Sequence, residues 1–420
     1  MSESLRIGLL THSVNPRGGV VHTVELAQAL HAQGHDVTVF APAVDGQRLF
    51  RSVDCRFEPV PVGPASGDVV DMARSRIAAF VAHLSPRVER SRFDVLHAQD
   101  GLGANALATL QQRGLIAGFV RTVHHLDLFA DPQLAAWQTR GVLAARGVLC
   151  VSRLWQQRLQ DELGVQARCV NNGVDLTRYS RRPDAHDSAL AQRLGLRGGP
   201  VFVAVGGVEA RKNTRRVLQA FALLKPALPQ AQLLITGGAS LLDHADYVHA
   251  FRDDLRDSGL SEGAGGDVVI TGVLDDADMP SLFRLADVLV MASTREGFGL
   301  VVLEALASGT PVVASRIAPF TEYLDDDTAR WADPLDTASI AQAMQQALDP
   351  ARAALLRTPP AVCHRYSWAA SAARHVDLYR ALCIAPARQS KLPEDFTCPP
   401  CTSPSAGRTR PKPAVTRHRW

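Results

Sequence analysis

The chain has 420 residues, of which 46% are hydrophobic and 21% are charged, and its formal net charge is only +3. This balance is typical of a globular protein, and so small a charge points to no particular class of partner. The length exceeds one ordinary hydrophobic core and predicts two domains of roughly 150–200 residues.

The cysteine pattern and the apolar segments bear on location. Seven cysteines are scattered along the chain, an odd and dispersed set that favours free thiols in a reducing cytosol over a disulfide framework. No apolar segment approaches the length of a membrane span. The apolar run near the N-terminus is too short for a signal peptide and is better interpreted as a strand, so we expect a cytoplasmic protein.

Short apolar runs alternate with amphipathic helical patterns along most of the chain. Runs typical of strands lie at 5–12, 35–42, 93–99, 118–125 and 147–152, and again at 200–207, 231–238, 267–273, 287–293 and 311–315. Helical patterns include 21–34, 214–228 and 279–286. Because the strands are apolar throughout, both faces of each sheet must be covered. The pattern therefore predicts an α/β fold with two doubly wound parallel sheets and a ligand cleft between the carboxyl ends of their strands.

The polar segment 179–200 contains Pro183 and a Gly-Gly-Pro break, has no strand pattern, and predicts the domain boundary. We expect a first domain over 1–180 and a second over 181–366. An amphipathic segment at 364–382 predicts a terminal helix, placed at 367–385. The basic, Pro-rich residues 386–420 predict a disordered tail, in which the Cys-Pro-Pro-Cys sequence is interpreted as incidental.

Three glycine-containing turns come where a strand passes into a helix. They are Gly18–Gly19, Gly206–Gly207 followed by Arg211 and Lys212, and Gly297 with Gly299. Glycine lets a ligand approach the backbone, and a helix N-terminus offers free N–H groups and partial positive charge, so such turns bind anions. An ordinary tight turn is the alternative, and the better interpretation of Gly18–Gly19 taken alone. The two turns in the second half favour a diphosphate site.

Two glutamates flank the sequence Gly-Phe-Gly at 297–299. If a helix begins near Gly299 or Leu300, Glu304 lies in an apolar neighbourhood where a carboxylate needs partners such as ribose hydroxyls. Glu296 lies beside the anion site and can meet a sugar. The alternative is that Glu304 faces solvent and Glu296 stabilises the helix N-terminus. The acids at 275–278 and 325–327 are interpreted as loop acids or helix caps rather than metal ligands.

The segment 293–315, STREGFGLVVLEALASGTPVVAS, resembles the signature of the retaining glycosyltransferases of family 4, in which seven residues separate two glutamates. Further segments resemble that family in the same order along the chain. They are GGVVHTVELAQALHAQGHDVTVF, VRTVHHLD, CVNNGVDLTRY, GGVEARKN and VVITGVLDDADMPSLFRLADVLVMAS. The resemblance extends from residue 5 to about 382. It implies the GT-B fold, with two Rossmann-like domains around a cleft and a last helix that packs back on the first domain.

The resemblance also implies roles for individual residues in binding a uridine or guanosine diphosphate sugar. Glu304 would bind the ribose, Glu296 the donor sugar, and Lys212 the leaving diphosphate. His124 would lie near the reacting carbon, with His125 as its alternative, and His97 is a further candidate for which a structural role is equally good. The remaining donor contacts implied are the backbone at Gly297, Phe298, Gly299 and Val273, and Gly19 lining the cleft from the first domain.

One departure concerns the phosphate loop, where Gly207 stands in place of the arginine usual in the family; Arg211 can replace its charge. The mechanism implied is front-face displacement onto an acceptor hydroxyl, with no metal and no protein nucleophile. The alternatives are a sugar-nucleotide epimerase, an inverting transferase on the same fold, or a non-catalytic sugar-nucleotide-binding protein. We expect small-molecule partners, no nucleic acid, and at most peripheral contact with a membrane.

Overall fold

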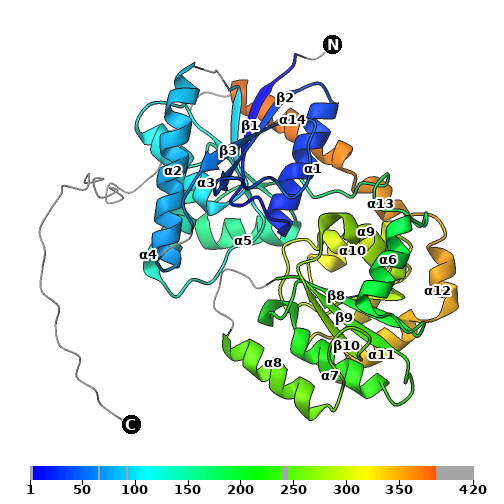
Figure 1. Cartoon of the computed structure of the whole chain (residues 1–420). Helices are drawn as coiled ribbons and strands as arrows, with labels where there is room; N and C mark the ends of the chain where they lie inside the picture. The colour runs from blue at the N-terminus through cyan, green and yellow to red at the C-terminus, as the bar shows by residue number, and fades with distance from the viewer. Residues whose placement is uncertain (1–2, 65–66, 91–92, 239–244, 385–420) are drawn as a thin grey trace, which may run out of the picture.

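The computed structural model describes residues 3–64, 67–90, 93–238 and 245–384, so the predicted tail at 386–420 lies outside the described residues. Within them the chain forms two β-sheets, each covered by helices (Figure 1). The strand order is β3-β2-β1-β4-β5-β6-β7 in the first sheet and β10-β9-β8-β11-β12-β13 in the second. Every strand pair is parallel, which confirms the predicted α/β class with two Rossmann-like sheets.

The strands of the first sheet are β1 (Arg6–Leu10), β2 (Asp36–Ala43), β3 (Arg56–Pro61), β4 (Val95–Ala98), β5 (Val120–Val123), β6 (Gly147–Cys150) and β7 (Arg168–Cys169). Those of the second are β8 (Val201–Val205), β9 (Gln232–Thr236), β10 (Val268–Gly272), β11 (Val288–Met291), β12 (Val312–Ser315) and β13 (Arg330–Ala332). All ten predicted strands are present. The three that the sequence missed, β3, β7 and β13, lie at sheet edges, where a strand has one neighbour and needs no continuous apolar run.

The helices around the first sheet are α1 (Gly18–Ala32), α2 (Val69–Arg90), α3 (Gly101–Gln112), α4 (Pro132–Leu143) and α5 (Arg153–Leu163). The later helices are α6 (Ala185–Leu194), α7 (Thr214–Leu224), α8 (Ala245–Asp257), α9 (Met279–Leu285), α10 (Leu300–Ala307), α11 (Thr337–Ala347), α12 (Pro350–Leu355), α13 (Ala361–Arg365) and α14 (Trp368–Ile384), with 3-10 turns η1 (Ala210–Lys212), η2 (Asp276–Asp278) and η3 (Phe320–Glu322). α14 spans nearly the same residues as the terminal helix placed at 367–385, and the short helix α13 precedes it.

Two segments cross between the sheets side by side, one at residues 173–174 and the other at residues 366–368. The N–H of Val174 donates to the carbonyl of Tyr366 at 2.9 Å, and a side chain at Gly173 would collide with the backbone of Ser367 and Trp368. After the second crossing, α14 returns to the first sheet (Figure 1). There Trp368 and Tyr379 join a core cluster with residues of β1, β2 and α1. The limits assigned above to the two domains stay a prediction.

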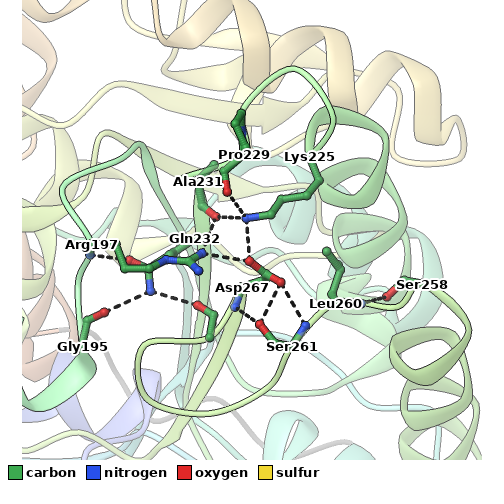
Figure 2. A network of polar contacts seen from close by, with 11 residues as sticks. Gly195, Arg197, Lys225, Pro229, Ala231, Gln232, Ser258, Leu260, Ser261 and Asp267 are labelled. Atoms are coloured by element: carbon green, nitrogen blue, oxygen red, sulfur yellow. Dashed lines mark hydrogen bonds and ion pairs between the residues drawn. The ribbon is translucent and has the colours of Figure 1, made fainter.

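A polar network fixes the amino ends of the second sheet (Figure 2). Asp267, just before β10, accepts from Lys225 at 2.6 Å, from Arg197 at 2.9 Å and from the Ser261 hydroxyl at 2.8 Å. Burial alone would raise the pKa of Asp267, but these donors hold it well below its usual range. The anchored amino ends leave the loops at the opposite, carboxyl ends of the strands to form the site.

Candidate donor-binding site

Glu296 lies in the loop between β11 and α10, with 8% of its surface exposed. Its carboxylate accepts from Lys212 Nζ at 2.6 Å, from Arg211 Nη1 at 3.2 Å and from the backbone N–H of Gly297 at 3.0 Å. Burial alone would raise the pKa of Glu296, but the two cations lower it to about 2. The predicted partners from two separate loops therefore form one ion cluster, in which Glu296 is ionised at neutral pH.

The loop after β8 explains why position 207 carries no arginine. Gly207 has a φ of +72°, and a Cβ there would lie 2.8 Å from the carbonyl oxygen of Gly237 in the next loop. Such a position disfavours any residue with a side chain. Arg211 instead brings the second cation to Glu296, while its Nε donates to Glu209 at 3.0 Å. The lost charge is thus restored from η1, four residues farther along the chain.

The Gly-Phe-Gly turn leads directly into α10, which begins at Leu300 as predicted. Gly299 has a φ of +92°, a left-handed conformation that suits glycine. The ring of Phe298 is 3% exposed and stacks on Tyr323, with ring centroids 4.9 Å apart. The side chain of Phe298 therefore belongs to the core, and only its backbone is available to a ligand. At the start of α10 the N–H of Val302 donates to the carbonyl of Gly299 at 3.0 Å, and the amides that precede it in the first turn have no acceptor within the helix.

Glu304, on the second turn of α10, is 7% exposed and does not face bulk solvent. Among the described residues its carboxylate makes no hydrogen bond. Burial, and then repulsion from Glu25, raise its pKa to about 8, although Arg178 and Arg51 act in the opposite direction. A largely buried carboxyl that makes no hydrogen bond to the described residues is suited to a ligand that supplies hydroxyl donors.

A salt-bridge network next to Glu304 joins the two halves. Arg51, in the loop after β2, forms a bidentate pair with Asp276 at 2.8 and 2.9 Å and also pairs with Glu25 of α1. Arg178 Nη2 donates to the same aspartate at 2.8 Å. The sequence did not single out Arg51 or Glu25, and Asp276 was interpreted as a loop acid or helix cap. No local motif marks these residues, because their partners are distant in sequence.

His124 follows β5 and meets the second half of the chain directly. Its Nε2 lies 3.2 Å from Gln99 Oε1, its ring lies edge-on to His22 at 4.6 Å, and a Cβ at Gly19 would lie 3.7 Å from it. Burial, and then the charges of His22 and Arg121, keep the pKa of His124 well below its usual value, so the ring is neutral at pH 7.

Two contacts bring His124 and Glu296 into one region. A Cβ at Gly297 would collide with the carbonyl oxygen of His124. Trp155 Nε1, from α5, donates to the carbonyl of Glu296 at 3.2 Å. Sequence reasoning missed Trp155 and Gln99, which carry no motif, although both follow predicted strands at the carboxyl edge of the first sheet.

The other predicted residues are placed differently. His97 is fully buried, and its ring nitrogens lie 2.7 Å from the hydroxyl of Tyr379 and 2.8 Å from that of Thr122, so it lies beneath the site rather than in it. The side chain of His125 is 40% exposed and lies 3.4 Å from Asp127. Val273 follows β10, is 63% exposed and contacts the glycine loop after β9.

Within 3–64, 67–90, 93–238 and 245–384, no three histidine, cysteine, aspartate or glutamate side chains gather in an arrangement that could hold a metal ion. No helix in those ranges is long and apolar enough to span a membrane.

Comparison with known families matches the two halves of the chain separately. Residues 16–178 match the model described as Glycosyltransferase Family 4, and residues 189–354 match that of the glycosyl transferases group 1. The chain is a family 4 glycosyltransferase. It is thus an enzyme that uses a nucleotide sugar to transfer a hexose.

Curated relatives of this glycosyltransferase include a phosphatidyl-myo-inositol mannosyltransferase of Mycolicibacterium smegmatis. The two are 29% identical over 390 residues, which are 90% of this chain and 94% of the relative. An alpha-monoglucosyldiacylglycerol synthase of Streptococcus pneumoniae is 26% identical over 74% of this chain and 71% of the relative.

Solved structures support the GT-B fold. A sucrose-phosphate synthase from Thermosynechococcus elongatus superposes with a TM-score of 0.72 at 23% identity, covering 90% of this chain and 99% of that one. The Anabaena protein HepE, crystallised with UDP and glucose, superposes with a TM-score of 0.71 at 18% identity, covering 90% of this chain and 100% of that one. At these identities the likeness concerns the fold alone.

Proposed function

We propose that this glycosyltransferase moves a hexose from a uridine or guanosine diphosphate sugar to an acceptor hydroxyl with retention of anomeric configuration. The observation that carries the proposal is the cluster in which Glu296, Lys212 and Arg211 meet beside a neutral His124. It brings a cation for the leaving diphosphate, a carboxylate for the sugar and an uncharged imidazole to one place. The relatives named for mannosyl and glucosyl transfer support a hexose as the group transferred.

Each half of the chain has a distinct task in this proposal. Residues 181–366 form the donor domain, where Glu304 accepts from the ribose hydroxyls and the backbone after β10, at Val273, lies near the base. The amides at Gly297 and Gly299 contact the sugar and phosphate. Residues 1–180, with residues 367–385 packed on them, form the acceptor domain, and Gly19 lines its side of the site. The odd, dispersed cysteine set supports a cytoplasmic location.

The reaction proposed is a front-face displacement. The acceptor hydroxyl attacks the anomeric carbon from the side on which the diphosphate leaves, and the departing phosphate oxygen accepts the hydroxyl proton. Lys212, with the N-terminus of α10, stabilises the charge that develops on the phosphate, which is where electrostatic catalysis has its largest effect. His124 hydrogen-bonds the sugar as a neutral ring and fixes its orientation. No protein nucleophile and no metal enter this scheme.

Proton NMR of the anomeric centre of the product is the decisive experiment. Retention supports front-face displacement, whereas inversion would assign an inverting transferase, and a donor epimerised without transfer would assign an epimerase. Because the relatives' names include lipid-linked acceptors, the acceptor panel should contain an inositol lipid and a diacylglycerol beside free sugars and sugar phosphates. A peripheral membrane contact would then appear as turnover of the lipid acceptors only.

A non-catalytic binding protein is tested with variants. Donor hydrolysis and transfer should be measured in the wild type and in Lys212→Ala, with Arg256→Ala as a matched control because its side chain is 72% exposed and far less constrained. Donor binding without turnover in the wild type would contradict the catalytic proposal. Turnover lost in Lys212→Ala and retained in Arg256→Ala would support it.

A further inference from the structure

A pocket of about 370 Å³ opens where α5, α14 and the crossing segments meet, apart from the donor site. Its lining includes three arginines, one glutamate and one thiol: Arg153, Arg365, Arg374, Glu322 and Cys169. The carboxylate of Glu322 is occupied by the backbone N–H groups of Arg153 and Leu154, at 2.7 and 2.8 Å, at the start of α5. The guanidinium groups therefore leave the pocket positively charged, and its size suits a small organic anion.

The thiol in this pocket has a second thiol beside it. Cys169 on β7 is the register partner of Cys150 on β6. Neighbouring strands lie about 4.8 Å apart, within the separation of about 4.4–6.8 Å between the α-carbons of disulfide-bonded cysteines. Cys169 packs against the core cluster that contains Cys150, and both cysteines are free. A disulfide between them therefore needs little movement of the backbone.

The environments of the two thiols differ in the way that thiol exchange requires. The neighbouring Cys150 thiol lowers the pKa of Cys169, against the effect of burial, with help from Asn171 and the charge of Arg374. Asn171 Nδ2 lies 3.3 Å from the Cys169 sulfur. Cys150 is fully buried and its pKa is raised, first by the neighbouring Cys169 and then by burial. Cys169 is thus the more accessible and the more acidic of the two thiols and is suited to attack first, and Cys150 is the thiol held in reserve.

We propose that this pocket binds an anionic low-molecular-mass disulfide, such as oxidised glutathione, and that Cys169 and Cys150 exchange with it to form a disulfide. Cys169 attacks one sulfur of the bound disulfide, a mixed disulfide forms and the first small thiolate leaves. Cys150 then attacks the Cys169 sulfur, and its proton passes to the second small thiolate as that group leaves. The two protein thiols are oxidised by two electrons, and the small disulfide is reduced to two thiols.

The arginines supply the selectivity of this site. Oxidised glutathione carries carboxylates that Arg365 and Arg374 can bind, while cystamine is cationic and hydroxyethyl disulfide is neutral. The anionic disulfide should therefore react fastest and the cationic one slowest. Because these guanidinium groups are solvent-exposed, replacing either by glutamine should reduce the preference by roughly two- to fivefold.

The experiment maps cysteine modification by mass spectrometry in the folded full-length enzyme treated with each of the three disulfides. Cys383, Cys398 and Cys401 are replaced by serine in every protein compared, so that their thiols do not contribute. The wild-type pair should yield a peptide linked through Cys150 and Cys169 that dithiothreitol separates. Cys150→Ser should stop at the mixed disulfide on Cys169, and Cys169→Ser should give neither product.

Cys55→Ala is the matched control, because burial raises the pKa of Cys55 to about 11 and its loss should leave the exchange unchanged. Thermal unfolding of every variant establishes that it is folded before treatment. The proposal is overturned if Cys169 stays reduced while other cysteines react, or if Cys150→Ser accumulates no mixed disulfide. Equal rates with glutathione disulfide and cystamine would overturn the anion site.

Discussion

Glu304 gives the sharpest test of the donor site, because its pKa of about 8 makes nucleotide binding depend on pH. A carboxylate that accepts from two ribose hydroxyls must be ionised, whereas the same group in the unliganded enzyme is largely protonated at pH 7. Binding therefore releases a proton at pH 7 and releases almost none at pH 9. We expect the affinity for UDP or GDP to rise over this range in the wild type.

The magnitude follows from the pKa. About one tenth of Glu304 is ionised one pH unit below its pKa and about nine tenths one unit above it, so Kd should fall about tenfold from pH 7 to pH 9. Glu304→Gln removes a charged acceptor, which costs about 1.5–3 kcal/mol at pH 9 where the wild type is ionised. At pH 7 the deficit should be smaller by about 1.4 kcal/mol, because only the wild type must lose a proton there.

Isothermal titration calorimetry with UDP and GDP at pH 7, 8 and 9 provides the measurement. This window begins about one unit above the last phosphate pKa of about 6, so the ligand phosphates are already about nine tenths ionised at pH 7 and change little across it. Glu262→Gln serves as a matched control, because that glutamate is 41% exposed and pairs only with Arg252 among the described residues. A wild-type affinity that stays constant from pH 7 to 9, or an equal pH dependence in Glu304→Gln, would refute the ribose assignment.

Three further predictions address the chemistry, the domain contact and acid stability. Lys212→Ala should lower kcat by roughly 10²–10³, and Glu296→Ala should lower kcat more than it lowers nucleotide affinity. Steady-state kinetics and calorimetry check both expectations. Equal losses of kcat and of nucleotide affinity in Glu296→Ala would contradict its role at the sugar. Arg51→Ala leaves the buried Asp276 with one cation fewer and should loosen the contact between the two sheets. Small-angle scattering would detect this as a larger radius of gyration, and an unchanged radius would argue against it. Burial lowers the pKa of His375 to about 4, so the free energy of unfolding falls as pH drops below 6.5. In urea titrations, His375→Gln should reduce the loss of unfolding free energy between pH 7 and 5 by about 2 kcal/mol. An identical loss in the wild type and the variant would contradict this.

The sequence predicted the central strands because strands buried on both faces must be apolar throughout. Edge strands such as β7 escape this constraint, and Cys169 on that strand therefore gave no signal of its neighbour Cys150. At the site, Glu296 and Lys212 were foreseeable because loops at the carboxyl ends of adjacent parallel strands converge. The pairing of Arg51 with Asp276 was not, because it depends on how two sheets meet, which no local pattern records.

Gly207 shows that the residue at a single position can also depend on a contact that is distant in sequence. As a departure from the family pattern it suggested an incomplete phosphate clamp. The reason for the glycine lies in the carbonyl of Gly237, thirty residues farther along the chain, which occupies the space that a side chain would need. The replacement cation, Arg211, could be named from the sequence, but its approach to Glu296 required the geometry of both loops.

Charge balance in the ion cluster constrains how the donor must bind. Arg211 and Lys212 carry two positive charges and Glu209 and Glu296 two negative ones, so the cluster as a whole is neutral. A neutral cluster offers a diphosphate no net attraction. We therefore expect Lys212 to exchange Glu296 for the phosphate when the donor enters, which frees the carboxylate for the sugar hydroxyls and adds the α10 amides as phosphate donors. The ion pair between Lys212 and Glu296 thus holds both groups in position before the donor arrives, and their separation accompanies binding.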